Sequence, residues 1–340
     1  MVTMNARAIP DDPRLQRLAA WLRDALGWRD FRLSPASADA SFRRYFRARL
    51  PDGQTRIVMD APPDREDTAP FRRISALLAG MGLHVPEVLA ADAEQGFLLL
   101  TDLGTETYLP ALNADTVERL YGDALDALLT LQRHGPAELP PYDRALLLQE
   151  MALFRDWYLE THLGLALSEG ERQILAAAFD ALAASALEQP RVIVHRDYHS
   201  RNLMISEPNP GILDFQDAVM GPVTYDLVSL LRDCYIAWPR ERVEGWVRDH
   251  HRRARGQGIL GDVDFDTFLA WFDRMGIQRH LKATGIFARL NHRDGKPGYL
   301  QDIPRTLAYI RDVAPRYPDL ADFTTFLETR VFPILEDYPA

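Results

Sequence analysis

The hydrophobic pattern of this chain changes its period near residue 103, and that change limits the folds that are open to it. Before it, short segments rich in aromatic and β-branched residues predict strands at 31–34, 44–50, 55–61, 87–93 and 96–103. Asp52-Gly53 lies between two of these segments and is a strong hairpin signal. Helical spacing predicts an opening helix at 12–27 and a second helix at 71–82. Residues 1–102 are therefore predicted to form a small sheet with one main packed helix.

Helical spacing dominates from residue 113 onward, with predicted helices at 117–134, 146–163 and 169–188. Short strands interrupt this pattern between Arg191 and Asp214, and helices resume from Val223. The order predicts an α+β fold of two lobes, a small antiparallel-sheet N-lobe at 1–102 and a larger, mainly helical C-lobe at 103–340. The cleft between two such lobes is a common ligand site.

Composition argues against several classes of function. A formal charge of -10 opposes binding to nucleic acid or to an anionic membrane surface, because such binding depends on Lys and Arg. A single cysteine, Cys234, permits neither an internal disulfide nor a cysteine zinc site. The chain shows no apolar run of the length of a signal peptide or a membrane span. We therefore expect a cytoplasmic protein with no nucleic-acid, membrane or obligate protein partner.

The segment VIVHRDYHSRN, at 192–202, carries the clearest functional signal. Its first residues continue a buried strand, and the rest is too polar to extend it. On a helix, residues five apart point about 140° away from each other, so Asp197 and Asn202 could not face one ligand, and we predict a loop. LMIS and ILDF, on either side of EPNPG, predict a hairpin. Pairing Ile205 with Ile212 would bring Asp214 beside Asn202.

An amide and a carboxylate in this arrangement suit Mg²⁺, which takes a few protein oxygens and completes its shell with water and phosphates. Asp197 would then be placed to accept the proton of an attacking hydroxyl group. An aspartate, an asparagine five residues later and a second, metal-binding aspartate are the parts of a kinase catalytic loop. The segment therefore indicates phosphoryl transfer.

HRDYHSRN followed by LDF resembles the HxDxxxxN and (I/L)D(F/W) motifs of the aminoglycoside phosphotransferase-like kinases, and the resemblance extends over nearly the whole chain. It implies a protein-kinase-like fold that uses ATP and Mg²⁺. It also implies that Asp197 is the catalytic base and that Asn202 and Asp214 bind the metal. His195 and Asp226 would support the loop.

Two features depart from the family pattern. Met59 stands where a phosphate-binding lysine is expected, and the helix after it lacks the glutamate that would pair with that lysine. The turn that should cover the phosphates reads ASADASFRRYFR and has no glycine run. We expect Arg43 or Arg44 to supply the missing charge, because arginine binds phosphate oxygens well. The adenine is expected against Leu100, Thr101 and Asp102.

Three segments resemble one subgroup of this family, namely DASFRRYFR, VMDAPP and QRHLKATGIFARLNHRDGKPGYLQDIPR. The subgroup consists of kinases that phosphorylate the anomeric (C1) hydroxyl of N-acetylmuramate and N-acetylglucosamine in the recycling of cell-wall sugars, and its members share the missing lysine. Its substrates imply a cation for the lactyl carboxylate of N-acetylmuramate. Arg289 is a candidate for that cation, and Asp217 is a candidate for the sugar hydroxyl groups.

Several alternatives remain open at this stage. The chain could phosphorylate choline, fructosamine, an aminoglycoside or another small hydroxylated molecule. A metal-dependent hydrolase could use His195, Asp197 and His199, and a non-catalytic nucleotide-binding module could also lack the lysine. GQGILG, at 256–261, matches a dinucleotide-binding pattern, but helical surroundings predict a loop between helices. His250 and His251 before it are expected on a solvated helix end.

Overall fold

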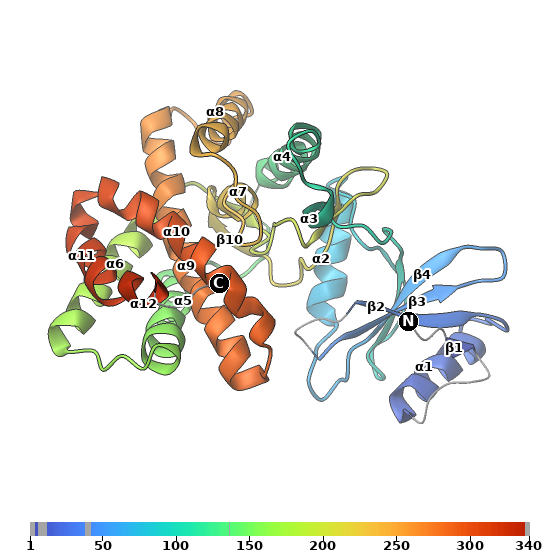
Figure 1. Cartoon of the computed structure of the whole chain (residues 1–340). Coiled ribbons are helices and arrows are strands. Elements are labelled where there is room, and N and C mark those ends of the chain that lie inside the picture. Colours follow the sequence, from blue (N-terminus) through green and yellow to red (C-terminus); the bar gives the residue numbers. More distant parts are fainter. Residues whose placement is uncertain (1–3, 6–11, 38–41, 136, 337–340) are drawn as a thin grey trace. The chain divides into compact units, whose positions relative to one another are not determined.

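The computed structural model of the chain describes residues 4–5, 12–37, 42–135 and 137–336 (Figure 1). The chain divides into two compact units. The first consists of Met1–Glu106 together with Met204–Asp217, and the second of Thr107–Leu203 together with Ala218–Ala340. Part of the turn expected over the phosphates, residues 38–41, lies outside the described ranges.

The first unit contains an antiparallel sheet in the order β1-β2-β3-β4-β6-β5. Its strands are β1 (Met4–Asn5), β2 (Arg32–Ser37), β3 (Arg44–Arg49), β4 (Thr55–Asp60), β5 (Val88–Asp92) and β6 (Phe97–Thr101). The strands predicted from the sequence and the Asp52-Gly53 hairpin are confirmed. Gly53 has a φ of +86°, and Gly96, between β5 and β6, has a φ of +73°. A Cβ on Gly96 would lie 1.8 Å from the carbonyl oxygen of Ala61, so this turn requires glycine.

Two predicted helices of this unit are confirmed as α1 (Pro13–Asp24) and α2 (Ala69–Gly80). Asp12 begins α1 by accepting the backbone N–H groups of Arg14 and Leu15. The apolar stripe of α1 packs on the sheet in one core formed by Leu15, Leu18, Leu22, Leu33, Phe46, Ala48, Val58, Phe97 and Leu99. The sheet therefore owes its buried face to a helix that precedes most of its strands in the chain.

A short hairpin of β8 (Leu203–Met204) and β9 (Gly211–Ile212) also forms, but not in the predicted register. The pairing of Ile205 with Ile212 is wrong. The N–H of Ile205 donates to Glu106 at 2.8 Å, and that of Ile212 donates to His84 at 2.8 Å. Prolines at 208 and 210 remove two further donors from the intervening segment, so the ladder is short.

The second unit is mainly helical, as predicted. Its helices are α3 (Tyr108–Ala111), α4 (Val117–Arg133), α5 (Arg144–Leu153), the π-helix η1 (Phe154–His162), α6 (Glu169–Leu187), α7 (Tyr225–Leu231), α8 (Arg240–Gly256), α9 (Phe265–Asp294), η2 (Pro297–Asp302), α10 (Ile303–Val313), η3 (Ala314–Arg316), η4 (Pro318–Leu320), α11 (Ala321–Arg330) and α12 (Phe332–Glu336). The strands β7 (Arg191–Val194) and β10 (Val219–Pro222) pair antiparallel. The long helix α9 packs against α5, η1, α6, α7 and α10 and forms the centre of this unit (Figure 1).

One predicted helix, 146–163, is divided into α5 and the π-helix η1 at Phe154. The division lies where α9 comes closest, because a Cβ on Gly285 would be 2.5 Å or less from the backbone of Leu153 and Phe154. Glycine at this position of α9 therefore allows two helical backbones to touch.

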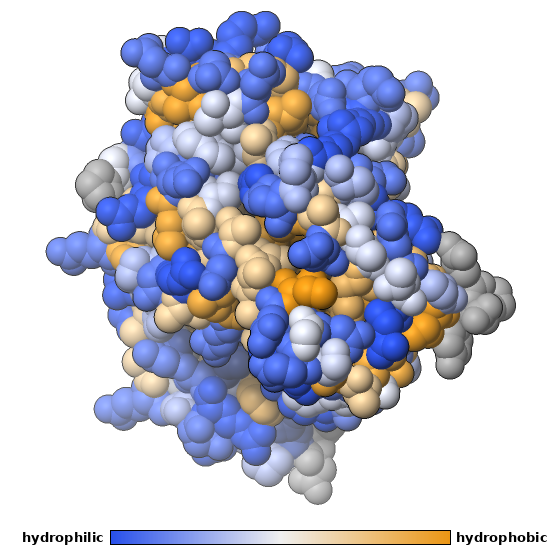
Figure 2. Space-filling view, turned by 90° about the vertical axis from the view of Figure 1, so that its left-hand side faces the viewer, coloured by the Kyte–Doolittle hydropathy of each residue, from blue (hydrophilic) through white to orange (hydrophobic). Residues whose placement is uncertain are grey.

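The surface is predominantly polar. On the face drawn in Figure 2, hydrophilic residues surround smaller hydrophobic areas. Within the described ranges, the exposed large hydrophobic side chains are Phe42, Leu89 and Leu187. None of the described helices combines the length and the apolar character that crossing a bilayer takes.

We expect Gly285→Ala to lower the free energy of unfolding by about 1–3 kcal/mol, because the added methyl group meets backbone that cannot move aside. The matched control is Gly245→Ala on α8, where no atom lies within 4 Å of the added Cβ. That change should raise stability by about 0.5–1 kcal/mol through helix propensity. Denaturant unfolding of both variants tests this, and equal effects would contradict the close contact.

Candidate active site

The loop from His195 to Asn202 follows β7 and is held in place by a buried carboxylate. Asp226, at the start of α7, accepts the backbone N–H of His195 at 2.6 Å and that of Arg196 at 3.0 Å. Burial raises the pKa of Asp226 to about 7, and these two hydrogen bonds act against the rise. Arg196 has a φ of +77°, so the chain turns sharply directly after β7. The turn directs Asp197 away from the line of the strand.

A second buried carboxylate, Asp233, holds the other end of the loop. It accepts the N–H of Ser200 at 2.9 Å and the Ser200 hydroxyl at 2.5 Å. The side-chain amide of Asn202 donates to the carbonyl of Asp197 at 3.0 Å, so these two predicted site residues lie together within the second unit. Asp233 was not predicted, because an aspartate after an apolar helix has no distinctive sequence signal.

Asp197 itself is surrounded by positive charge. Its backbone N–H donates to Nδ1 of His195 at 3.2 Å. Burial acts to raise the pKa of Asp197, but the charges of Lys282, His199 and Arg279 outweigh burial and keep that pKa below its ordinary value. The carboxylate is therefore ionised near neutral pH, as a proton acceptor must be.

A buried ion network lies beside the loop and was also missed by the sequence reasoning. Glu150 on α5 forms ion pairs with Lys282 on α9 at 3.0 Å and with Arg196 at 2.5 Å. Tyr142 donates to the same carboxylate, and Lys282 donates to the Tyr225 hydroxyl at 3.0 Å. The available signal was a single charge within an apolar helical run, in LLLQEMALF and HLKATGIF.

The remaining predicted metal ligand, Asp214, belongs to the first unit. It follows β9 with a φ of +64°, and one of its oxygens accepts the side-chain amide of Gln216 at 2.8 Å. The guanidinium of Arg43 lies 3.9 Å from Asp214 and 3.9 Å from Glu66. A cation is thus adjacent to the predicted metal-binding carboxylate within one unit.

Arg44 occupies a different environment from Arg43. Its guanidinium binds Asp60 at 2.5 Å and Asp12 at 2.5 Å, and Arg14 binds the same Asp60 carboxylate. The side chain of Asp60 is fully buried. Arg44 is therefore committed to a carboxylate pair that holds α1 to the sheet.

The segment predicted to face adenine also lies in the first unit. Leu100 is buried in β6, and Thr101 accepts the N–H of Glu87 through its hydroxyl at 2.9 Å. The carboxylate of Asp102 binds Arg47 at 2.6 Å. Met59 is fully buried within β4, so the position expected for lysine contributes to the core.

The two predicted sugar contacts lie on different units. Asp217 is exposed and follows Asp214 in the first unit. Arg289 lies on α9, with a buried Nε that has no hydrogen-bond partner. Burial and the nearby charge of Arg293 lower the pKa of Arg289.

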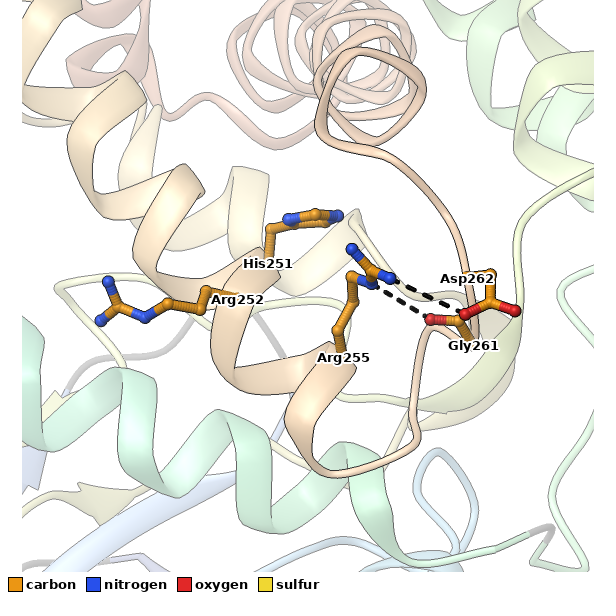
Figure 3. Close-up of a pocket in the computed structure, with 5 residues that line it drawn as sticks. All are labelled: His251, Arg252, Arg255, Gly261 and Asp262. Carbon is orange, nitrogen blue, oxygen red and sulfur yellow. Dashed lines mark hydrogen bonds and ion pairs between the residues drawn. The ribbon is translucent and has the colours of Figure 1, made fainter.

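GQGILG joins α8 to α9, which confirms the prediction of an inter-helix loop. His250 and His251 are buried, with Nε2 of His251 bonded to Val263 at 2.8 Å, so their prediction as a solvated helix end is wrong. A pocket of about 320 Å³ lies here, and Arg255 points across it toward Gly261 and Asp262 (Figure 3). Its lining contains no residue of the predicted site.

The described ranges contain no group of three or more His, Cys, Asp or Glu side chains arranged to hold a metal. The hydrolase alternative, which requires His195, Asp197 and His199 around one ion, therefore has no support from this geometry. Nδ1 of His195 is instead engaged by the backbone of Asp197.

Residues 32–265 match the phosphotransferase enzyme family, APH, and the chain belongs to this family. It is 50% identical over 322 residues to an N-acetylmuramate/N-acetylglucosamine kinase of Pseudomonas putida, covering 92% of this chain and 95% of that protein. The kinase of the same name from Pseudomonas aeruginosa is 49% identical over 328 residues, and the match covers 93% of this chain and 97% of that protein. That from Neisseria meningitidis is 44% identical over 316 residues, with 92% and 94% covered.

Solved structures agree on the fold. The gentamicin-APH(2")-IIa complex matches with a TM-score of 0.59 at 13% identity, covering 88% of this chain and 97% of that one. An ethanolamine kinase of Plasmodium vivax matches with a TM-score of 0.59 at 10% identity, covering 88% of each chain. The predicted fold of a small antiparallel sheet followed by a mainly helical part is confirmed.

We expect Glu150→Gln to lower the free energy of unfolding by about 3–5 kcal/mol, because Lys282 and Arg196 would lose their shared carboxylate. Burial acts to raise the pKa of Glu150, but the two cations hold it below 4.5. This stabilisation is therefore present above pH 4.5 and is lost as the pH falls through the lower folded value.

Denaturant unfolding of the wild type and the variant at neutral and acidic pH measures both effects. The control is Asp180→Asn, which breaks the exposed pair with Arg144 and should cost about 1 kcal/mol or less. A similar cost for both variants would show that the Glu150 network contributes no more than a surface ion pair.

Proposed function

We propose that this chain is an ATP-dependent kinase that transfers phosphate to the anomeric hydroxyl of N-acetylmuramate and N-acetylglucosamine. The observation that carries the proposal is the identity of about half of all residues, over more than nine-tenths of both chains, with kinases named for these two sugars. The product would be the sugar 1-phosphate, and the cellular role would be the recycling of cell-wall sugars in the cytoplasm, where ATP is available.

Asp197 acts as the base in this proposal. One carboxylate oxygen orients the C1 hydroxyl and accepts its proton as the hydroxyl oxygen bonds to the γ-phosphorus of ATP. The bond from that phosphorus to the bridging oxygen breaks, and ADP carries the electron pair away. The low pKa of Asp197 suits this role, because the carboxylate is ready to accept a proton at neutral pH. The hydrogen bonds of Asp226 and Asp233 to the loop limit its movement.

Asn202 and Asp214 would hold Mg²⁺. Their amide and carboxylate oxygens are the ligand types that this ion prefers, and the amide nitrogen of Asn202 is already engaged by Asp197. When bound, the ion neutralises charge on the phosphates. His195 supports the loop through its contact with the Asp197 backbone.

Residues 1–102 would cover the nucleotide, and 103–340 would supply the catalytic loop and the sugar pocket. For the phosphates we favour Arg43 over Arg44, since the Arg43 guanidinium lies 3.9 Å from Asp214, whereas Arg44 is bound to Asp60 and Asp12. With the Asp102 carboxylate bound to Arg47, the contribution of Leu100, Thr101 and Asp102 to adenine binding would come chiefly from the backbone.

A panel of acceptors with ATP and Mg²⁺ tests the proposed function. We expect turnover of N-acetylmuramate and N-acetylglucosamine, and little or none of choline, fructosamine or an aminoglycoside. Phosphorus NMR of the product should show the phosphate on C1. Asp197→Ala should reduce turnover by orders of magnitude while circular dichroism stays unchanged. Phosphate on an oxygen other than that of C1 would refute the anomeric hydroxyl as the acceptor. An active Asp197→Ala variant would refute Asp197 as the base.

We expect Arg43→Ala to raise the KM for ATP about tenfold or more, since it removes a charge-assisted contact to phosphate. Arg44→Ala should instead lower thermal stability, because it removes a partner of the buried Asp60 carboxylate. Steady-state kinetics at varied ATP, together with melting temperatures, separate the two roles. The reverse pattern would assign the phosphates to Arg44.

A further inference from the structure

The helix α9 carries a buried guanidinium, Arg279, whose hydrogen-bond partners among the described residues are incomplete. Only 5% of Arg279 is exposed. One terminal nitrogen donates to the sulfur of Cys234 at 3.7 Å, and the buried Nε has no partner. No described carboxylate forms an ion pair with Arg279. A thiol is a weak acceptor, so most of the donors of this guanidinium have no strong acceptor.

Three other buried or half-buried cations of the second unit each form an ion pair with a carboxylate. Lys282, one turn further along α9, binds Glu150 at 3.0 Å, and Arg232 binds Asp273 at 2.5 Å. Arg196 binds Glu150 at 2.5 Å. Burial acts to lower the pKa of Arg279, but nearby groups that include Asp233 and Asp197 outweigh burial and raise that pKa. Neither carboxylate forms an ion pair or a hydrogen bond with Arg279, so its donors remain available to another anion. Such a group is suited to an anion that arrives with a ligand.

A second buried polar atom without a partner lies nearby, on the catalytic loop. Nδ1 of His199, two residues after Asp197, has no hydrogen-bond partner, and its ring meets the edge of Tyr235 at 5.3 Å between centroids. Burial lowers the pKa of His199 against the carboxylates of Asp233 and Asp197, and the charge of Arg279 adds to the lowering. Arg279 contacts Cys234, and His199 contacts Tyr235, the next residue, so the two groups lie close together. Both also act to lower the pKa of Asp197.

We propose that Arg279 and His199 bind the lactyl carboxylate of N-acetylmuramate. The inference rests on the proposed function and deepens it. When the C1 hydroxyl lies at Asp197, the lactyl group extends from C3 of the same sugar ring, so its carboxylate needs a cation close to the loop. N-acetylglucosamine has a neutral hydroxyl group at C3 and does not require that ion pair.

Arg289, the cation nominated from the sequence, lies ten residues further along the same helix. That separation corresponds to about 15 Å along the axis. The charge of Arg279 is among those that lower the pKa of Asp197. The position on the helix therefore favours Arg279 for a group that shares a ring with the reacting hydroxyl.

The test compares the two sugars in one variant. Arg279→Met should reduce kcat/KM for N-acetylmuramate about 10- to 100-fold, as expected for loss of a charge-assisted contact. The value for N-acetylglucosamine should fall clearly less, because this sugar loses no ion pair. N-acetylmuramate should raise the melting temperature of the wild type but not of the variant.

Arg274→Met is the matched control. Arg274 lies on the same helix and binds Asp319 at 2.7 Å, so its loss should leave the ratio of the two kcat/KM values unchanged. If Arg279→Met does not fold, Arg279→Lys replaces it. Lysine keeps the charge but not the planar set of donors of arginine. The kcat/KM for N-acetylmuramate divided by that for N-acetylglucosamine should therefore still fall.

Three results would overturn the inference. Equal losses of kcat/KM for both sugars would mean that Arg279 maintains the loop and does not bind the lactyl carboxylate. If Arg289→Met selectively lost activity on N-acetylmuramate while Arg279→Met kept it, the lactyl carboxylate would be assigned to Arg289. A wild type that phosphorylates neither sugar would refute the proposed function itself, which the acceptor panel detects independently of any variant.

Discussion

The proposed catalytic loop, residues 195–202, depends on one interaction, in which the buried carboxylate of Asp226 accepts two consecutive backbone N–H groups. Where β7 ends, these groups would otherwise be buried without partners, and such groups are costly. The left-handed turn at Arg196 follows directly and directs Asp197 out of the strand. Asp233 then satisfies the other end of the loop at Ser200, so a segment without regular structure is held at both ends by carboxylates from the helical unit.

The helix α9 gives this loop its electrostatic character. Lys282 and Arg279 are one turn apart and both act on Asp197, but their own environments differ. Lys282 is neutralised by Glu150 and serves the fold, whereas the one hydrogen-bond acceptor of Arg279 among the described residues is a thiol. The close approach of α9 at Gly285 to the junction of α5 and η1 is part of the same arrangement, because it places Lys282 within reach of Glu150.

In the first unit, too, some arginines are bound to carboxylates that hold the fold together, and another lies beside a proposed site residue. Asp60 is fully buried and binds both Arg14 and Arg44, so those arginines join α1 to the sheet. Arg47 is bound to Asp102. Arg43, directly before β3, lies beside Asp214. With Met59 buried in the sheet, the phosphate-binding charge of this kinase would come from Arg43, directly before β3, and not from β4.

The sequence alone determined the strands, most of the helices, the loop nature of residues 195–202 and the kinase chemistry. These follow from local periodicity, turn residues and the Asp197-to-Asn202 spacing, all of which act over a few neighbouring residues. Only the tertiary structure decided the register of β8 and β9, the burial of His250 and His251, and the roles of Glu150, Asp233 and Arg279. Those depend on which distant side chain completes a hydrogen bond or an ion pair. Arg43 and Arg44 are adjacent in sequence, and packing alone distinguishes the one bound to the buried Asp60 from the one beside Asp214.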